Sequence, residues 1–81
     1  MLAPVTDEVI NLVCQAYDCG LLQFDPMMLC GITVIMDMYR QWNTVTVNYD
    51  GKLLKVNVYD NDSQETQHAT IKTLIKDVVR L

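Results

Sequence analysis

Residues 25–42 read DPMMLCGITVIMDMYRQW, and we expect this segment to organise the fold. Asp25 can act as an N-cap, and Pro26 suits the first helical position, where its missing N–H costs nothing. Wound at about 100° per residue, the apolar residues fall into two stripes rather than one. The pattern therefore predicts a central helix over residues 25–42 that is apolar on two faces.

The two stripes of this helix differ in what they predict. The wider stripe is expected to face the core and comprises Met28, Leu29, Ile32, Ile35, Met36, Tyr39 and Trp42. The second stripe comprises Met27, Cys30, Val34 and Met38. Soft, methionine-rich strips recur at adaptable binding surfaces, but a helix buried all round shows the same pattern. The second stripe is therefore either a protein interface or additional core.

A helix is also predicted before this segment, over about residues 6–19. Thr6 can cap it, and Asp7 and Glu8 follow where the helix dipole favours negative charge. Gly20 suits the position just beyond a helix end. Residues 21–24 are then expected to form a short apolar linker.

Residues 44–59, TVTVNYDGKLLKVNVY, predict a β-hairpin. Asp50-Gly51 is a two-residue type I′ signal, because both turn positions require positive φ. That turn pairs Tyr49 with Lys52, and its register places one apolar set on one face: Val45, Val47, Leu54, Val56 and Val58. A lone two-stranded ribbon has open edges, so the hairpins of two copies could join into one sheet.

A last helix is predicted over about residues 62–81, where Asp62 and Glu65 form a pair like a capping box. The predicted fold is thus α+β, in the order α-α-β-β-α, with a two-stranded antiparallel hairpin packed on three helices. A length of 81 residues is that of one small domain, so residues 1–81 are expected to share a single core of limited size.

The chain carries a net charge of −4, and every Lys and Arg lies at or after Arg40. Phosphate repels an acidic chain, so we do not expect direct nucleic-acid binding. We find no apolar run of the roughly 18 residues that suggest a membrane span, and the first residues, MLAPVTDEV, do not read as a secretory signal. The expected compartment is the cytoplasm, either of a cell or of an infected host.

Catalytic chemistry is not expected from the cysteines or the single histidine. Cys14, Cys19 and Cys30 have no CxxC spacing, which is typical of reduced thiols that act as small apolar residues. The best candidate for a Cys–His pair would combine His68 with Cys14 or Cys30, and it would also need an oriented oxyanion site. We therefore predict that the protein is not an enzyme.

No metal or cofactor is expected either. Asp60, Asp62 and Glu65 loosely resemble the start of a calcium loop, but the glycine and glutamate that such a loop needs are missing. The chain has no glycine-rich phosphate loop. Helix capping accounts for these acidic residues better than metal binding does.

The function predicted from these features is protein binding. We expect a small acidic homodimer that serves as an adaptor or as an inhibitor docking on a larger protein complex, a class that includes phage inhibitors of host nucleic-acid enzymes. The candidate interface residues are Met27, Cys30, Val34 and Met38. Two alternatives are a nucleic-acid-associated β-ribbon that uses Lys52 and Lys55, and a phosphate mimic built from the acidic N-terminal half.

Overall fold

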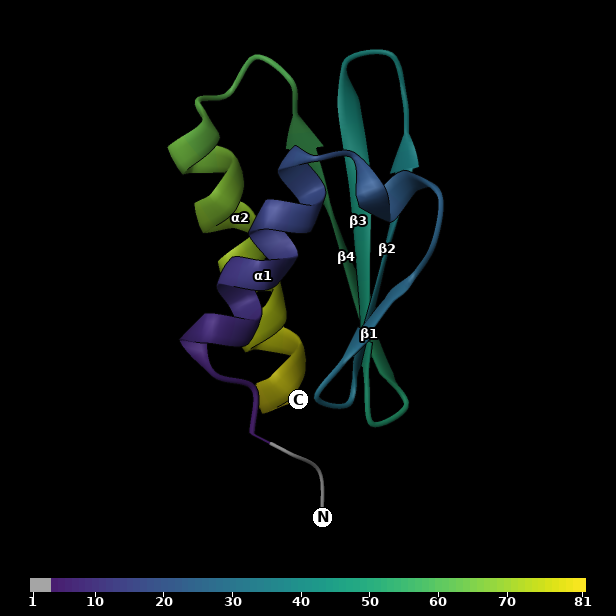
Figure 1. Ribbon diagram of the computed structural model, residues 1–81, viewed down its shortest axis with the longest axis vertical. Helices are drawn as coiled ribbons and strands as arrows, with labels where there is room; N and C mark the ends of the chain where they lie inside the picture. The colour runs from purple at the N-terminus through teal and green to yellow at the C-terminus, as the bar shows by residue number, and fades with distance from the viewer. Residues whose placement is uncertain (1–3) are drawn as a thin grey trace.

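The computed structural model describes residues 4–81. These residues form two α-helices, α1 (Asp7–Asp18) and α2 (Gln64–Arg80), and a 3-10 turn, η1 (Leu21–Gln23). They also form four strands: β1 (Met27–Leu29), β2 (Ile32–Met38), β3 (Trp42–Tyr49) and β4 (Lys52–Tyr59). The strands make one antiparallel sheet in the order β1-β2-β3-β4, and both α-helices lie on the same side of it (Figure 1).

The predicted central helix is wrong, and so is the predicted fold of three helices and a two-stranded hairpin. Residues 25–42 instead supply β1, β2 and the first residue of β3. Cys30 and Gly31 have φ values of 51° and 84° and connect β1 to β2, with Leu29 paired to Ile32. A left-handed backbone at two successive residues cannot continue a right-handed helix.

Strand β2 alternates between the two faces of the sheet. Ile32, Val34 and Met36 are buried, whereas the residues between them are partly or fully exposed. Residues 32–35, ITVI, are all β-branched, and such side chains favour strands over helices. The apolar segment therefore contributes the half-buried second strand of the sheet.

The predicted hairpin is confirmed, and its register is the one that the turn requires. Tyr49 pairs with Lys52, and the ladder continues as far as Trp42 opposite Tyr59. Asp50 and Gly51 both have positive φ, 52° and 76°, as a type I′ turn demands. The hairpin thus forms β3 and β4 of the larger sheet.

The first predicted helix is present as α1. Thr6 is its N-cap, and the Thr6 Oγ1 atom accepts a hydrogen bond from the Val9 amide at 3.3 Å. The helix ends at Asp18 with Cys19 as its C-cap, and Gly20 follows at φ 74°. A bulkier residue at that φ would be strained, so Gly20 lets the chain reverse into η1.

The last predicted helix is present as α2, but its cap is one residue later than expected. Ser63 rather than Asp62 is the N-cap, and its Oγ atom accepts from the Thr66 amide at 3.1 Å. The backbone oxygen of Asp62 instead accepts a hydrogen bond from Gln67 Nε2 at 2.9 Å. No helix in the described part of the chain has both the length and the apolar character to cross a membrane.

The core lies between the helix pair and the inner face of the sheet. Its most completely buried side chains are Val13, Ile32, Val34, Val45, Val47, Val58, Ile71, Ile75 and Val78. They come from both α-helices and from three of the four strands. The helices thereby use one face of the sheet and leave the other free for contact.

Candidate functional site

The candidate site is the face of the sheet that points away from the α-helices, called here the open face. Successive side chains of a strand point to opposite faces, so the neighbours of buried Val45 and Val47 point outward. Neither α-helix packs on this side (Figure 1). The register places these residues on the open face: Met28, Thr33, Ile35, Asp37, Trp42, Thr44, Thr46, Asn48, Leu53, Lys55, Asn57 and Tyr59.

Three aromatic side chains gather at one end of the open face, and we call them the aromatic cluster: Tyr39, Trp42 and Tyr59. Tyr39 stacks on Trp42 with ring centroids 5.1 Å apart and ring planes 13° apart. The tight turn between β2 and β3 positions this stack, since the Tyr39 amide donates to the Trp42 oxygen at 2.9 Å. Tyr59 lies opposite Trp42 on the neighbouring strand.

The aromatic cluster is open to solvent. Tyr39 is 52% exposed and Tyr59 is 46% exposed. A hollow beside the stack is lined by Tyr39, Trp42, Thr44, Lys55, Val56 and Asn57. Tyrosine and tryptophan pair a large apolar body with a polar tip, which makes them effective anchors at interfaces.

The rest of the open face mixes apolar and polar side chains. Met28 on β1, Ile35 on β2 and Leu53 on β4 are exposed apolar residues, whereas β3 presents threonine and asparagine. Only Asp37 and Lys55 carry charge among its strand residues, so the face is close to neutral. This surface can bury apolar area and exchange hydrogen bonds with a protein, without a strong field for a charged ligand.

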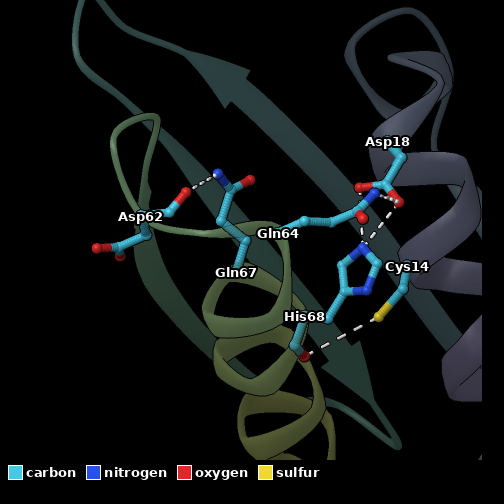
Figure 2. Close-up of polar contacts among 6 residues, drawn as sticks. All are labelled: Cys14, Asp18, Asp62, Gln64, Gln67 and His68. Atoms are coloured by element: carbon cyan, nitrogen blue, oxygen red, sulfur yellow. Dashed lines mark hydrogen bonds and ion pairs between the residues drawn. The ribbon is translucent and has the colours of Figure 1, made fainter.

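A second polar arrangement joins the two helices (Figure 2). The His68 Nε2 atom lies 2.8 Å and 2.9 Å from the two carboxylate oxygens of Asp18. Gln64 Nε2 donates to the same carboxylate at 2.9 Å. The cluster therefore fastens the end of α1 to the first turns of α2.

Cys14 lies beside this cluster, but its geometry differs from that of an activated Cys–His pair. Its Sγ atom contacts the backbone oxygen of His68 at 4.0 Å rather than the imidazole ring (Figure 2). Burial raises the pKa of the Cys14 thiol, and the nearby charge of Asp18 raises it further, against an opposing effect of Lys72. A catalytic thiol needs the opposite shift, because the thiolate is the nucleophile.

The acidic residues near the start of α2 take structural positions. Asp60 Oδ1 accepts from Asn43 Nδ2 at 3.3 Å, and Glu65 lies in the first turn of the helix. Across residues 4–81, no three His, Cys, Asp or Glu side chains are grouped so that they could hold a metal ion.

The four residues predicted as an interface do not share one strip. Met27 is half-buried on β1, and Cys30 lies in the turn that follows. Val34 is 0% exposed in the core, so it offers no surface, whereas Met38 at the end of β2 is 59% exposed. Met27 lies directly opposite Val34 on the inner face of the sheet, whereas Cys30 lies in the turn and Met38 at the exposed end of β2, so the four residues form no common exposed strip.

The aromatic cluster was not predicted from the sequence, although the sequence carries a signal for it. The hairpin register set by Asp50-Gly51, extended outward to the last pair, places Trp42 opposite Tyr59. Both residues then share the face of Thr44 and Asn57. Assigning Trp42 to a helix hid this relationship.

Comparison of the chain with protein-family models, curated proteins and solved structures gave no match.

Proposed function

We propose that this chain is a small, non-enzymatic protein-binding domain that acts as a homodimer and holds a larger protein on its open face. The observation that supports this proposal is the exposed aromatic cluster at the end of a sheet face that neither α-helix covers. Buried aromatic anchors dominate the energetics of many protein interfaces. The partner is expected to cover Tyr39 and Ile35 together.

The charge of the open face favours a protein over a nucleic acid. Asp37 and Lys55 offset each other there, and the whole chain carries −4. A nucleic-acid surface draws most of its affinity from many Lys and Arg contacts with phosphate. A nearly neutral face that combines aromatic anchors with threonine and asparagine side chains resembles the composition of a protein interface.

An adaptor or an inhibitor is the role that we propose for such a domain. It has one broad face with which to occupy a larger complex, and phage-type inhibition of a host nucleic-acid enzyme is one form that we propose for this role. The cytoplasm is the compartment that we propose, and Cys14, Cys19 and Cys30 are all free thiols, as a reducing compartment favours.

The test is retention of a native partner by matched variants. The wild-type chain, Tyr39→Ala and Ile35→Thr are immobilised and exposed to extract of the native host, with Leu12→Ala as the control. Leu12 is a comparably exposed apolar residue, at 46%, but it lies on α1. The proposal expects one protein to be retained by wild type and Leu12→Ala, with its Kd at least about tenfold weaker for Tyr39→Ala.

The reverse pattern would reject the open face as the binding surface. In that case Tyr39→Ala and Ile35→Thr would keep the partner, and Leu12→Ala would lose it. Circular dichroism of each variant shows whether the fold is retained, so loss of binding is compared only among folded chains.

A second candidate is single-stranded nucleic acid, which the Tyr39–Trp42 stack specifically favours. Bases stack on exposed aromatic rings with little dependence on sequence. This candidate predicts that oligonucleotides at low salt quench Trp42 fluorescence and that added salt reverses the effect. An unchanged emission spectrum at low salt would remove it.

A further inference from the structure

The two edges of the sheet are very unequal. Strand β1 has three residues and comes directly after Pro26, so it offers little backbone to another chain. Strand β4 has eight residues without proline and, among residues 4–81, pairs only with β3. Edge strands are commonly protected from strand addition by being short or by containing proline. Strand β4 is neither short nor interrupted by proline.

The free edge of β4 presents a defined set of backbone groups. Alternate residues of an antiparallel strand direct their N–H and C=O groups toward opposite neighbours. Just beyond the strand, the Asp60 amide donates to the Gln41 oxygen at 3.1 Å, so even-numbered residues bond toward β3. The odd-numbered residues therefore direct their backbone groups to the free edge: Leu53, Lys55, Asn57 and Tyr59.

We infer that β4 pairs antiparallel with β4 of a second copy, with Val56 opposite Val56 at the two-fold axis. This inference rests on the homodimer proposed above and names its surface. The register places Lys52 opposite Asp60, Leu53 opposite Tyr59 and Lys55 opposite Asn57. Opposite charges therefore meet at both ends of the pairing, and an aliphatic side chain meets an aromatic one beside them.

Neighbouring registers are less favourable. A shift of one residue would turn every inward side chain outward, so only shifts of two preserve the faces. One such shift puts Lys55 directly opposite Lys55, where like charges repel, and the other puts Leu54 opposite Asp60. Centring on Val56 avoids both pairings. Within its own chain, Lys52 Nζ also donates to the backbone oxygen of Leu81.

The surroundings of Val56 leave room for an added strand. On the helix side, a groove runs between β4 and α2, where the α2 residues include Ala69, Thr70 and Thr73. On the open face, the hollow beside the aromatic cluster also reaches Val56. A strand added at this edge directs alternate side chains into these two hollows, because its residues alternate between faces.

The pairing has a consequence for the proposed binding function. It joins two sheets into one, with all helices on one side and both open faces on the other. The two aromatic clusters then share one continuous surface. A partner that is itself two-fold symmetric would engage both clusters at once, which raises its apparent affinity without any new kind of contact.

The experiment combines solution mass with engineered cross-linking. Light scattering on the full chain is expected to give about twice 9.3 kDa. Val56→Cys, in a background of Cys19→Ser and Cys30→Ser, should form a disulfide-linked dimer under mild oxidation. Opposed residues at such a position have Cα atoms about 4.5 Å apart, within disulfide range. Leu53→Cys in the same background is the control, since the proposed register separates the two copies of residue 53.

Disruption at the same edge gives an independent readout. Asn57→Pro removes an N–H that points to the free edge, so the β3–β4 ladder should survive while the dimer is lost. If that variant fails to fold, Val56→Lys serves instead, because it places two like charges face to face at the two-fold axis. Either variant should give a folded chain with the mass of a monomer.

The outcomes separate this inference from the proposed function. A wild-type monomer at high concentration would overturn both the pairing and the homodimer. If the Leu53→Cys variant forms a cross-linked dimer and the Val56→Cys variant does not, only the proposed β4 pairing is overturned. The same holds for a dimer that persists in a folded Asn57→Pro or Val56→Lys variant. Binding by the open face is tested separately by Tyr39→Ala and Ile35→Thr, neither of which alters β4.

Discussion

Asp18 and His68 are 50 residues apart in the chain, yet a carboxylate oxygen of Asp18 lies 2.8 Å from the Nε2 atom of His68. The contact ties the last residue of α1 to α2. Both side chains are about one-third exposed, 29% for Asp18 and 32% for His68. Solvent therefore screens the Asp18–His68 pair. The pair links the two helices but contributes little to the free energy of unfolding.

We expect His68→Ala to lower the free energy of unfolding by no more than about 1 kcal/mol, because partly exposed pairs contribute little. Urea denaturation followed by circular dichroism measures the change. Thr73→Ala, at an exposed position on the same helix, is the control. A loss of several kcal/mol for His68→Ala would show that the cluster supports the core, contrary to this expectation.

Stability should fall at alkaline pH. Burial raises the pKa values of the Cys14 thiol and the Tyr17 hydroxyl above their ordinary values. The folded state then keeps protons that the unfolded state releases, so stability is complete below the ordinary thiol pKa of about 8.5 and declines as pH rises past it.

Cys14→Ala should reduce this dependence on pH, and Tyr17→Phe should reduce its more alkaline part. The measurement is urea denaturation at a series of pH values from neutral to strongly alkaline. Cys19→Ala, at an exposed cysteine, is the matched control and should leave the profile unchanged. An identical profile for wild type and both test variants would contradict the expectation.

Adjacent residues of β2 should respond oppositely to a charge. Val34 is 0% exposed and Ile35 is 38% exposed on the opposite face. Val34→Glu buries an unpaired carboxylate and should cost about 4 kcal/mol or more, enough to unfold much of a small domain. Ile35→Glu should remain folded, as judged by thermal melting. A folded Val34→Glu variant that had lost only self-association would instead support the predicted interface role of Val34.

In the turn of the β3–β4 hairpin, substitution should lower stability more at Gly51 than at Asp50. A Cβ atom at Gly51 would meet nothing within 4 Å, so the effect of Gly51→Ala comes from its φ of 76°. We expect a loss of about 1 kcal/mol. Asp50→Asn should change stability by less than about 0.5 kcal/mol, because asparagine also suits that turn position. Equal effects in urea denaturation would contradict this account.

The elements that could be predicted from sequence are those with a local chemical signal. Thr6, followed by two acids and an apolar face, indicated α1. Asp50-Gly51 determined the hairpin register, because a two-residue type I′ turn leaves no freedom in the pairing. Each signal acts within a few residues and does not depend on what packs above it.

The segment 25–42 lacked such a decisive signal. It is apolar at most positions, so a helical period and a strand period both find matches. The distinguishing features were Gly31 in the middle of the expected helix and the β-branched run that follows it. The Cys30-Gly31 turn leads to a strand only because β2 can then pair with β3. That pairing is a tertiary contact, which local sequence does not reveal.

The wrong assignment of residues 25–42 to a helix also prevented prediction of the candidate site. Tyr39 and Trp42 were placed in a core stripe, whereas the turn between β2 and β3 stacks them on the open face. Their exposure depends on which side of the sheet the α-helices occupy. That choice follows from burial of residues such as Val45 and Val47, and the register alone did not show that the other face stays uncovered.

The order of the strands also bears on how the chain folds. Each strand pairs with its neighbour in sequence, so the sheet closes through short loops that cost little entropy. Contact between α1 and α2 must instead close a loop of about fifty residues, which is slower. We therefore expect the sheet to assemble first. During synthesis α1 emerges before the sheet, yet it has to wait for α2 before the core can close.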